Sequence, residues 1–208
     1  MTENRFDQVA TQWDDNPVRR ALGDAVYAAI RATISFAPEH VILEYGCGTA
    51  AFGLRLAPEV RRVIAADSSE GMLAVVRQKI AAGSVPNVDV LPLDFGKDGP
   101  CGIVADRIVT IMALHHVTDP HTVLHRFAKC LVPGGMLAIA DLYAEDGSFH
   151  GPEQPVPHNG FVPEELRDTM LKAGFENIRW TEAHRVRKPV GDGMGEFPMF
   201  LMTATPAQ

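Results

Sequence analysis

The stretch Val41–Ala50, VILEYGCGTA, passes from a short apolar run directly into a glycine-rich turn. An uninterrupted apolar run is typical of a strand that is buried on both faces of a parallel sheet. Gly46 and Gly48 allow backbone N–H groups to approach a ligand closely, and the start of the following helix favours negative charge there. The stretch therefore predicts a strand whose carboxyl end carries a ligand-binding turn.

The chain on both sides of this stretch alternates between apolar runs and amphipathic patterns. Upstream, residues 17–34 carry apolar side chains three and four positions apart, with Asp15 or Asn16 as N-cap and Pro17 at the first helical position. Ser68 or Ser69 and Asp119 are expected to cap later helices. This alternation predicts right-handed βαβ units and a parallel sheet covered by helices on both faces. The further strand-like runs are 60–66, 88–93, 107–113 and 136–142.

The end of the chain breaks this alternation. A polar loop over residues 143–160 leads to a helix begun by Pro163 and stopped at Gly174, and two more strand-like runs follow at 175–186 and 197–203. The segment Gly191–Gly195 between them is too short for a helical crossover, so these two runs should pair as an antiparallel hairpin. The long loop is a candidate lid.

Composition limits the class of protein. The 208 residues, 46% hydrophobic and 22% charged, predict a single domain over 1–208, with an N-terminal helical cap segment (1–36) and a core (37–208). A polar N-terminus and the lack of an 18-residue apolar run predict a cytoplasmic protein with no membrane association. The net charge of −7 argues against nucleic acid as a partner. The cysteines, expected to be free thiols, are Cys47, Cys101 and Cys130.

Asp67 follows Gly46 by 21 residues, at the end of the second predicted strand. A carboxylate there can accept hydrogen bonds from ribose hydroxyls. Gly46, Gly48 and Ala51 also satisfy the pattern G-x-G-x-x-G/A. These features alone fit an NAD-dependent Rossmann oxidoreductase as well, so that alternative stays open at this point.

The complete set of segments resembles the class I S-adenosylmethionine-dependent methyltransferases, in particular the small-molecule group of the ubiquinone/menaquinone methyltransferase type. The resemblance covers about 41–174. It implies a Rossmann-like three-layer α/β/α sandwich of the α/β class, with a mostly parallel seven-stranded sheet ending in an antiparallel hairpin. Two positions depart from the family: Ala50, where a glycine is common, and Val162, where a capping Ser or Thr is common. The segments are VILEYGCGTA, AADSSEGML, LPLDF, IVTIMALHHVTDP, LVPGGMLAIADL and HNGFVPEELRDTMLKAGF.

The resemblance also implies a cofactor, S-adenosylmethionine, with S-adenosylhomocysteine as product. Glu44 and the turn backbone would hold its methionine end, and Asp67 its ribose. Asp94 and Phe95, with Ser68 or Met72, would frame the adenine, and Ala113 would sit by the sulfonium. The residues expected at the cofactor are Glu44, Tyr45, Gly46, Cys47, Gly48, Asp67, Ser68, Met72, Asp94, Phe95 and Ala113.

Histidines follow the fourth strand. His115 and His116 lie where ligands bind in such folds, so they are the candidates to face a methyl acceptor and to take a proton from it. His121 and His125 are expected on a helix surface, and no metal site is expected because neither a carboxylate nor a Cys converges with these histidines in sequence. Elsewhere, Phe6, Trp13, His150 and His158 either line the site or only support the segments that carry them.

The function predicted on this basis is transfer of a methyl group from S-adenosylmethionine to a small-molecule acceptor by in-line displacement, in a monomer or homodimer. In such a transfer the enzyme contributes mainly proximity, alignment and exclusion of water. An acidic residue two positions before Gly46, an Asp after the third strand and the terminal hairpin all argue against the dehydrogenase. A non-catalytic module that binds S-adenosylmethionine or S-adenosylhomocysteine is the second alternative.

Overall fold

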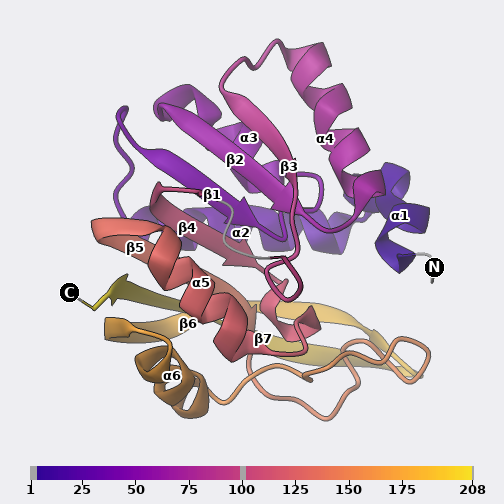
Figure 1. Ribbon diagram of the computed structural model, residues 1–208. Helices are drawn as coiled ribbons and strands as arrows, with labels where there is room; N and C mark the ends of the chain where they lie inside the picture. Colours follow the sequence, from indigo (N-terminus) through magenta and orange to yellow (C-terminus); the bar gives the residue numbers. More distant parts are fainter. Residues whose placement is uncertain (1–3, 99–101, 208) are drawn as a thin grey trace.

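The computed structural model describes residues 4–98 and 102–207, and its centre is a seven-stranded sheet (Figure 1). The strand order is β3-β2-β1-β4-β5-β7-β6. Neighbours among the first five strands pair in parallel, whereas β7 runs antiparallel to both β5 and β6, which confirms the predicted terminal hairpin. The strands are β1 Val41–Tyr45, β2 Arg62–Asp67, β3 Val88–Pro92, β4 Ala105–Ile111, β5 Leu131–Leu142, β6 Phe175–Val190 and β7 Gly193–Pro206.

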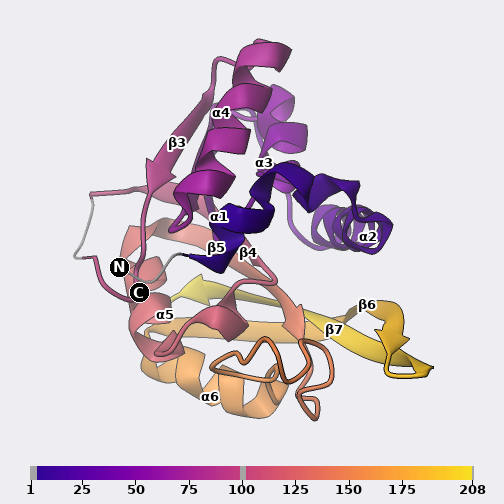
Figure 2. The ribbon, with the colours of Figure 1, turned by 90° about the vertical axis from the view of Figure 1, so that its right-hand side faces the viewer.

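Helices cover both faces of the sheet and complete the three layers (Figure 2). Successive residues of β1 point to opposite faces, so Ile42 packs with α2, α3 and α4, and Leu43 packs with α5 and α6. The α-helices are α1 Arg5–Val9, α2 Pro17–Thr33, α3 Ala51–Leu56, α4 Glu70–Gly83, α5 Pro120–Cys130 and α6 Pro163–Lys172. Short 3₁₀ turns are η1 Ala10–Asp15, η2 Ala57–Glu59 and η3 Leu114–His116. None of the described helices is both long and apolar enough to span a membrane.

Helix starts follow the capping chemistry of the sequence. The side chain of Asn16 accepts from the N–H groups of Val18 and Arg19, and Ser69 caps α4 through the N–H of Met72. Asp119 caps α5 in the same way. Val162 has no side-chain hydrogen bond to α6, as expected of an apolar residue at that position.

The hairpin turn and the start of β5 depart furthest from the predicted ranges. The hairpin turn consists of Gly191 and Asp192 alone, because the left-handed backbone of Gly191 (φ +54°) lets the chain reverse within two residues. β5 begins at Leu131 instead of Met136, because Leu131 already pairs with Ala105 on the far side of an irregularity in the ladder. Both differences arise from pairing with a neighbouring strand, which local sequence patterns do not reveal.

Candidate functional site

The glycine-rich turn after β1 is held against the end of β4. Gly46 and Gly48 have left-handed backbones, with φ of +65° and +53°. A Cβ placed on Gly46 would lie 2.4 Å from the Cβ of Ala113, so only glycine fits there. Ala50 is also left-handed (φ +54°), which costs an L-residue about 1–2 kcal/mol and explains why glycine is common at that position in the family.

Asp67, at the end of β2, joins the turn to the start of α4. Its Oδ2 accepts from the Gly48 N–H at 2.8 Å, and its Oδ1 accepts from the Ser69 N–H at 2.9 Å. Burial raises the pKa of this carboxyl above its ordinary value. Asp67 therefore sits beside the turn, at the carboxyl edge of the parallel strands, as the sequence analysis predicted for that edge. Two residues that follow Asp67 are predicted to contact the adenine. Ser68 is exposed and Met72 is buried.

Glu44 lies beneath the turn. Its side chain is only 4% exposed, and Oε2 accepts from the N–H of Gly53 in the first turn of α3 at 2.9 Å. Burial is the main cause that raises the pKa of Glu44 to about 8. In this arrangement the carboxyl group supports the turn from behind by tying it to α3.

Glu44→Gln tests this placement through stability. Because the pKa of the carboxyl in the folded protein is above its ordinary 4.5, the folded state binds more protons, and the free energy of unfolding should fall as the pH rises from about 4.5 to 8. One proton gives a slope of at most about 1.4 kcal/mol per pH unit. The amide cannot ionise, so Glu44→Gln should lose that slope and be more stable than the parent at pH 8.

Urea denaturation of the cofactor-free protein at pH 6, 7 and 8 measures this effect. Glu39→Gln, at an exposed position, is the matched control and should keep the parental slope. A Glu44→Gln protein with the same pH dependence as the parent would show that the buried carboxyl does not cause it.

Aromatic side chains fill the space under the predicted adenine side. The rings of Tyr45 and Phe95 stack with centroids 5.3 Å apart, Phe95 packs edge-on against Phe127, and the Tyr45 hydroxyl oxygen accepts from the Phe95 N–H. Phe95 is fully buried, so its ring belongs to the core. Asp94 accepts from the Gly96 N–H and pairs with Lys97.

Cys47, in the turn itself, is a buried free thiol. Burial, reinforced by the carboxylates of Glu44 and Asp67, raises its pKa well above the ordinary value. A thiol in that state is a poor nucleophile. Cys101 lies outside the described residues.

His115, in the turn η3 that follows β4, is fully buried and contacts Asp141 of β5. Its Nδ1 lies 2.6 Å from Asp141 Oδ1, and the carboxylate also accepts from the backbone N–H groups of His115 and Leu142. An ionised carboxylate can only accept hydrogen bonds, so this contact favours the tautomer of His115 whose proton is on Nδ1 and whose Nε2 is directed away from Asp141.

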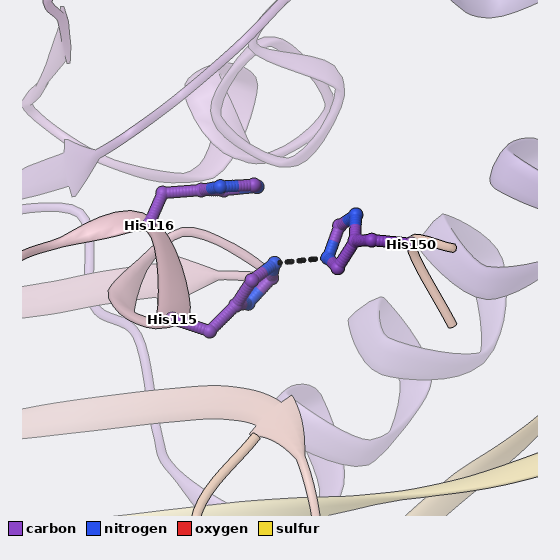
Figure 3. Close-up of side chains that lie close together, drawn as sticks. All are labelled: His115, His116 and His150. Carbon is purple, nitrogen blue, oxygen red and sulfur yellow. Dashed lines mark hydrogen bonds between the residues drawn. The ribbon is translucent and has the colours of Figure 1, made fainter. Parts of the chain in front are cut away.

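His150 meets His115 from the 143–160 loop, and His116 lies alongside (Figure 3). The two Nε2 atoms of His115 and His150 are 3.0 Å apart, and the ring centroids of His115 and His116 are 4.1 Å apart. Burial lowers the pKa of His116 to about 2 and that of His150 to about 4, with the nearby His115 as the next cause. His116 and His150 are therefore neutral imidazoles.

The two histidines of α5 do not belong to this group. His121 and His125 are exposed on the helix, as the sequence analysis expected. His150 was not distinguished by sequence, because its only signal was its place in a long polar loop. His158, in the same loop, donates its backbone N–H to the carbonyl of His115 and so helps to seat the loop against the group.

The N-terminal segment closes over the strand ends, beside α4 (Figure 2). The Phe6 ring packs edge-on against His116 at 5.1 Å and against Trp13 at 5.9 Å. Asp7 Oδ1 accepts from the Ser69 hydroxyl and from the Gly71 N–H, which ties α1 to the start of α4. Phe6 therefore lines the histidine group.

Gly71→Ala should detach this segment. A Cβ at Gly71 would lie 2.6 Å from the Cα of Asp7, and backbone at that distance has to move. We expect the amides of residues 5–15 to exchange with solvent at least about tenfold faster, as the loss of about 1.4 kcal/mol of local stability implies. Hydrogen exchange followed by mass spectrometry measures this change.

Gly23→Ala in α2 is the matched control, because a Cβ there meets nothing within 4 Å. It should leave exchange in residues 5–15 unchanged and stabilise the helix slightly. Equal protection of residues 5–15 in Gly71→Ala and in the parent would show that the contact between Asp7 and Gly71 does not hold the segment.

A surface hollow of about 380 Å³ opens beside Phe6, between the N-terminal segment and the 143–160 loop. Its lining combines aromatic rings with guanidinium groups. The lining includes Arg5, Phe6, Trp13, Arg19, Glu153 and Gln154. Because Phe6 contacts His116, the hollow borders the histidine group.

Comparisons with known proteins agree with this geometry. Residues 42–135 match the family model described as methyltransferase domain. The demethylmenaquinone methyltransferase of Mycobacterium tuberculosis is 31% identical over 140 residues, which are 65% of this chain and 56% of that protein. The chain spans a little over half the length of the curated relatives it matches, 53% and 56% for two of them.

Solved structures share the fold. A putative methyltransferase of Haloferax volcanii, solved in complex with the Trm112 methyltransferase activator, has a TM-score of 0.81 at 18% identity, with both chains covered completely. A SAM-dependent methyltransferase of Aquifex aeolicus has a TM-score of 0.66 at 20% identity, covering 94% of this chain and 97% of that one. By its sheet topology the chain has the fold of these solved methyltransferases, and its residues 42–135 are similar to the methyltransferase domain family.

Proposed function

We propose that this chain transfers a methyl group from S-adenosylmethionine to a small-molecule acceptor whose reacting atom lies against His115, His116 and His150. One observation carries the proposal. Gly46 of the glycine-rich turn packs directly against Ala113, and Ala113 is only two residues before His115. A cofactor on the turn and an acceptor at the histidines would therefore be neighbours at one edge of the sheet.

The residues at the turn suit the cofactor. The left-handed Gly48 leaves open space where a side chain would stand, with the Trp13 Nε1 as its nearest neighbour at 3.9 Å, and Asp67 offers a carboxylate at the same edge. S-adenosylmethionine supplies an electrophilic methyl group on a sulfonium. The chain's own part is to bind and orient the two reactants and to exclude water, for which the N-terminal segment and the 143–160 loop serve as covers.

The hollow beside Phe6 indicates the kind of acceptor. Aromatic rings favour a flat molecule, and Arg5 and Arg19 favour one that carries an anionic group. The demethylmenaquinone methyltransferase among the relatives is named for a small-molecule substrate, which supports the same class. We propose a single-domain enzyme that acts on such an acceptor. The match of residues 42–135 to the methyltransferase domain model favours this function over the dehydrogenase alternative.

Calorimetric titration with S-adenosylmethionine, S-adenosylhomocysteine and NADH is the first test. We expect saturable binding of the first two and none of NADH. Release of S-adenosylhomocysteine in a screen of flat, anionic acceptors would then support transfer. Tight binding of the cofactor with no release from any acceptor class would support the non-catalytic module instead, and binding of NADH alone would contradict the proposal.

A further inference from the structure

We propose that His115, His116 and His150 form a binding site for a divalent transition-metal ion of the class that imidazole prefers, with Zn²⁺ as the physiological candidate. One ring nitrogen of each histidine lies within 4.8 Å of one nitrogen of each of the others. The three rings come from two separate segments, η3 and the 143–160 loop, and lie close together (Figure 3). Imidazole suits Zn²⁺, Co²⁺ and Ni²⁺.

The spacing of the ring nitrogens is close to what such an ion requires. Zn–N bonds of about 2.0–2.1 Å in a tetrahedron place ligand nitrogens about 3.3–3.4 Å apart. The Nε2 atoms of His115 and His150 are 3.0 Å apart, so that pair already has nearly the right separation. The ligand nitrogen of His116 lies within 4.8 Å of the other two, so it has to approach them by at most about 1.5 Å to reach the same range.

Asp141 supplies the support that metal-binding histidines usually have. A ligating histidine commonly donates its other ring N–H to a carboxylate, which fixes the tautomer and the ring orientation. His115 does this through Nδ1, 2.6 Å from Asp141 Oδ1, and the carboxylate is itself held by two backbone N–H groups. The Nε2 lone pair of His115 therefore points into the group in a fixed direction.

Three protein ligands leave the fourth position of a tetrahedral ion open, which is typical of catalytic and not of structural sites. If the proposed function holds, this position suits the oxygen of a hydroxyl acceptor or the sulfur of a thiol acceptor. The bound ion lowers the pKa of such a group, and the proton passes to solvent. In the transfer, the new bond forms between that oxygen or sulfur and the methyl carbon, and the electron pair of the broken S–CH₃ bond stays on the cofactor sulfur.

Titration of the chelator-treated protein with Co²⁺ tests the metal site without cofactor or acceptor. Four-coordinate Co²⁺ absorbs visible light strongly, so binding is seen directly. His121 and His125 stand one helical turn apart on α5 and form a possible surface site, so all proteins carry His121→Ala. We expect one equivalent of Co²⁺ with four-coordinate absorption, and displacement of Co²⁺ by Zn²⁺.

His150→Ala is the decisive variant, because His150 is half-buried on a loop and its removal leaves the sheet intact. It should weaken Co²⁺ binding at least about 100-fold, and Asp141→Asn should weaken it about 10–100-fold. His184→Ala, on β6, is the control and should bind Co²⁺ with the parental affinity. Absence of four-coordinate Co²⁺ in the parent, or equal binding in His150→Ala, would overturn the metal site, whereas cofactor binding would be unaffected by either result.

Discussion

Asp67→Ala is expected to weaken binding of S-adenosylhomocysteine at least about 100-fold. If the carboxylate accepts hydrogen bonds from two ribose hydroxyls, each bond that the substitution removes costs about 1.5–3 kcal/mol of binding free energy. Each 1.4 kcal/mol is a factor of about ten in affinity. The same substitution leaves the N–H groups of Gly48 and Ser69 without their acceptor, which loosens the turn and adds to the loss. Calorimetry with S-adenosylhomocysteine measures the change directly.

Two further variants separate these causes. Asp67→Asn keeps an oxygen that can accept from one of the two N–H groups but has no charge. Its affinity for S-adenosylhomocysteine should therefore lie between those of the parent and Asp67→Ala. Asp89→Ala, an exposed carboxylate on the adjacent strand β3 that pairs with Arg62, should bind as the parent does. A dissociation constant for Asp67→Ala within about threefold of the parental value would rule out a ribose contact by this carboxylate, because two charged hydrogen bonds are worth far more.

Much of this fold follows from local sequence signals. Apolar runs mark strands, and the caps Asn16, Ser69 and Asp119 start α2, α4 and α5, because a side-chain oxygen there satisfies a backbone N–H that would otherwise have no partner. The short segment between the last two runs correctly predicts a hairpin. The glycine-rich turn and Asp67 converge because the carboxyl ends of neighbouring parallel strands meet at one edge of the sheet.

The remainder depends on contacts between distant segments. His150 reaches His115 across 35 residues because the backbone of the loop is tied to β5 and to His115, and no local pattern encodes that meeting. The direction of a side chain is likewise set by its surroundings. Glu44 is directed to α3 by the N–H of Gly53, and Phe95 turns into the core to stack on Tyr45. The sequence pattern places Glu44 at the end of a strand and Phe95 just after another, and tertiary packing decides what each side chain touches.

His115→Ala is expected to lower turnover at least about 100-fold while the dissociation constant of S-adenosylhomocysteine stays within about twofold. Nε2 of His115 lies 3.0 Å from His150 Nε2, within the group where we propose that the reacting atom lies. A side chain that moves a proton or positions the reacting atom contributes about 10²–10⁴-fold to the rate. The cofactor turn is separated from this ring by Ala113, so binding of the product should not change.

The unchanged affinity also serves as the folding control, because a protein that had lost its sheet could not retain the cofactor site. His121→Ala, on the exposed face of α5, should keep parental turnover. The turnover of Asp141→Asn should be closer to that of His115→Ala than to that of the control. An amide NH₂ that faces the His115 backbone N–H replaces an acceptor by a donor and disturbs the tautomer of the ring. A His115→Ala protein with parental turnover would place the reacting atom away from the histidines, whereas loss of both turnover and S-adenosylhomocysteine binding would mean that the ring supports the fold and does not act on the acceptor.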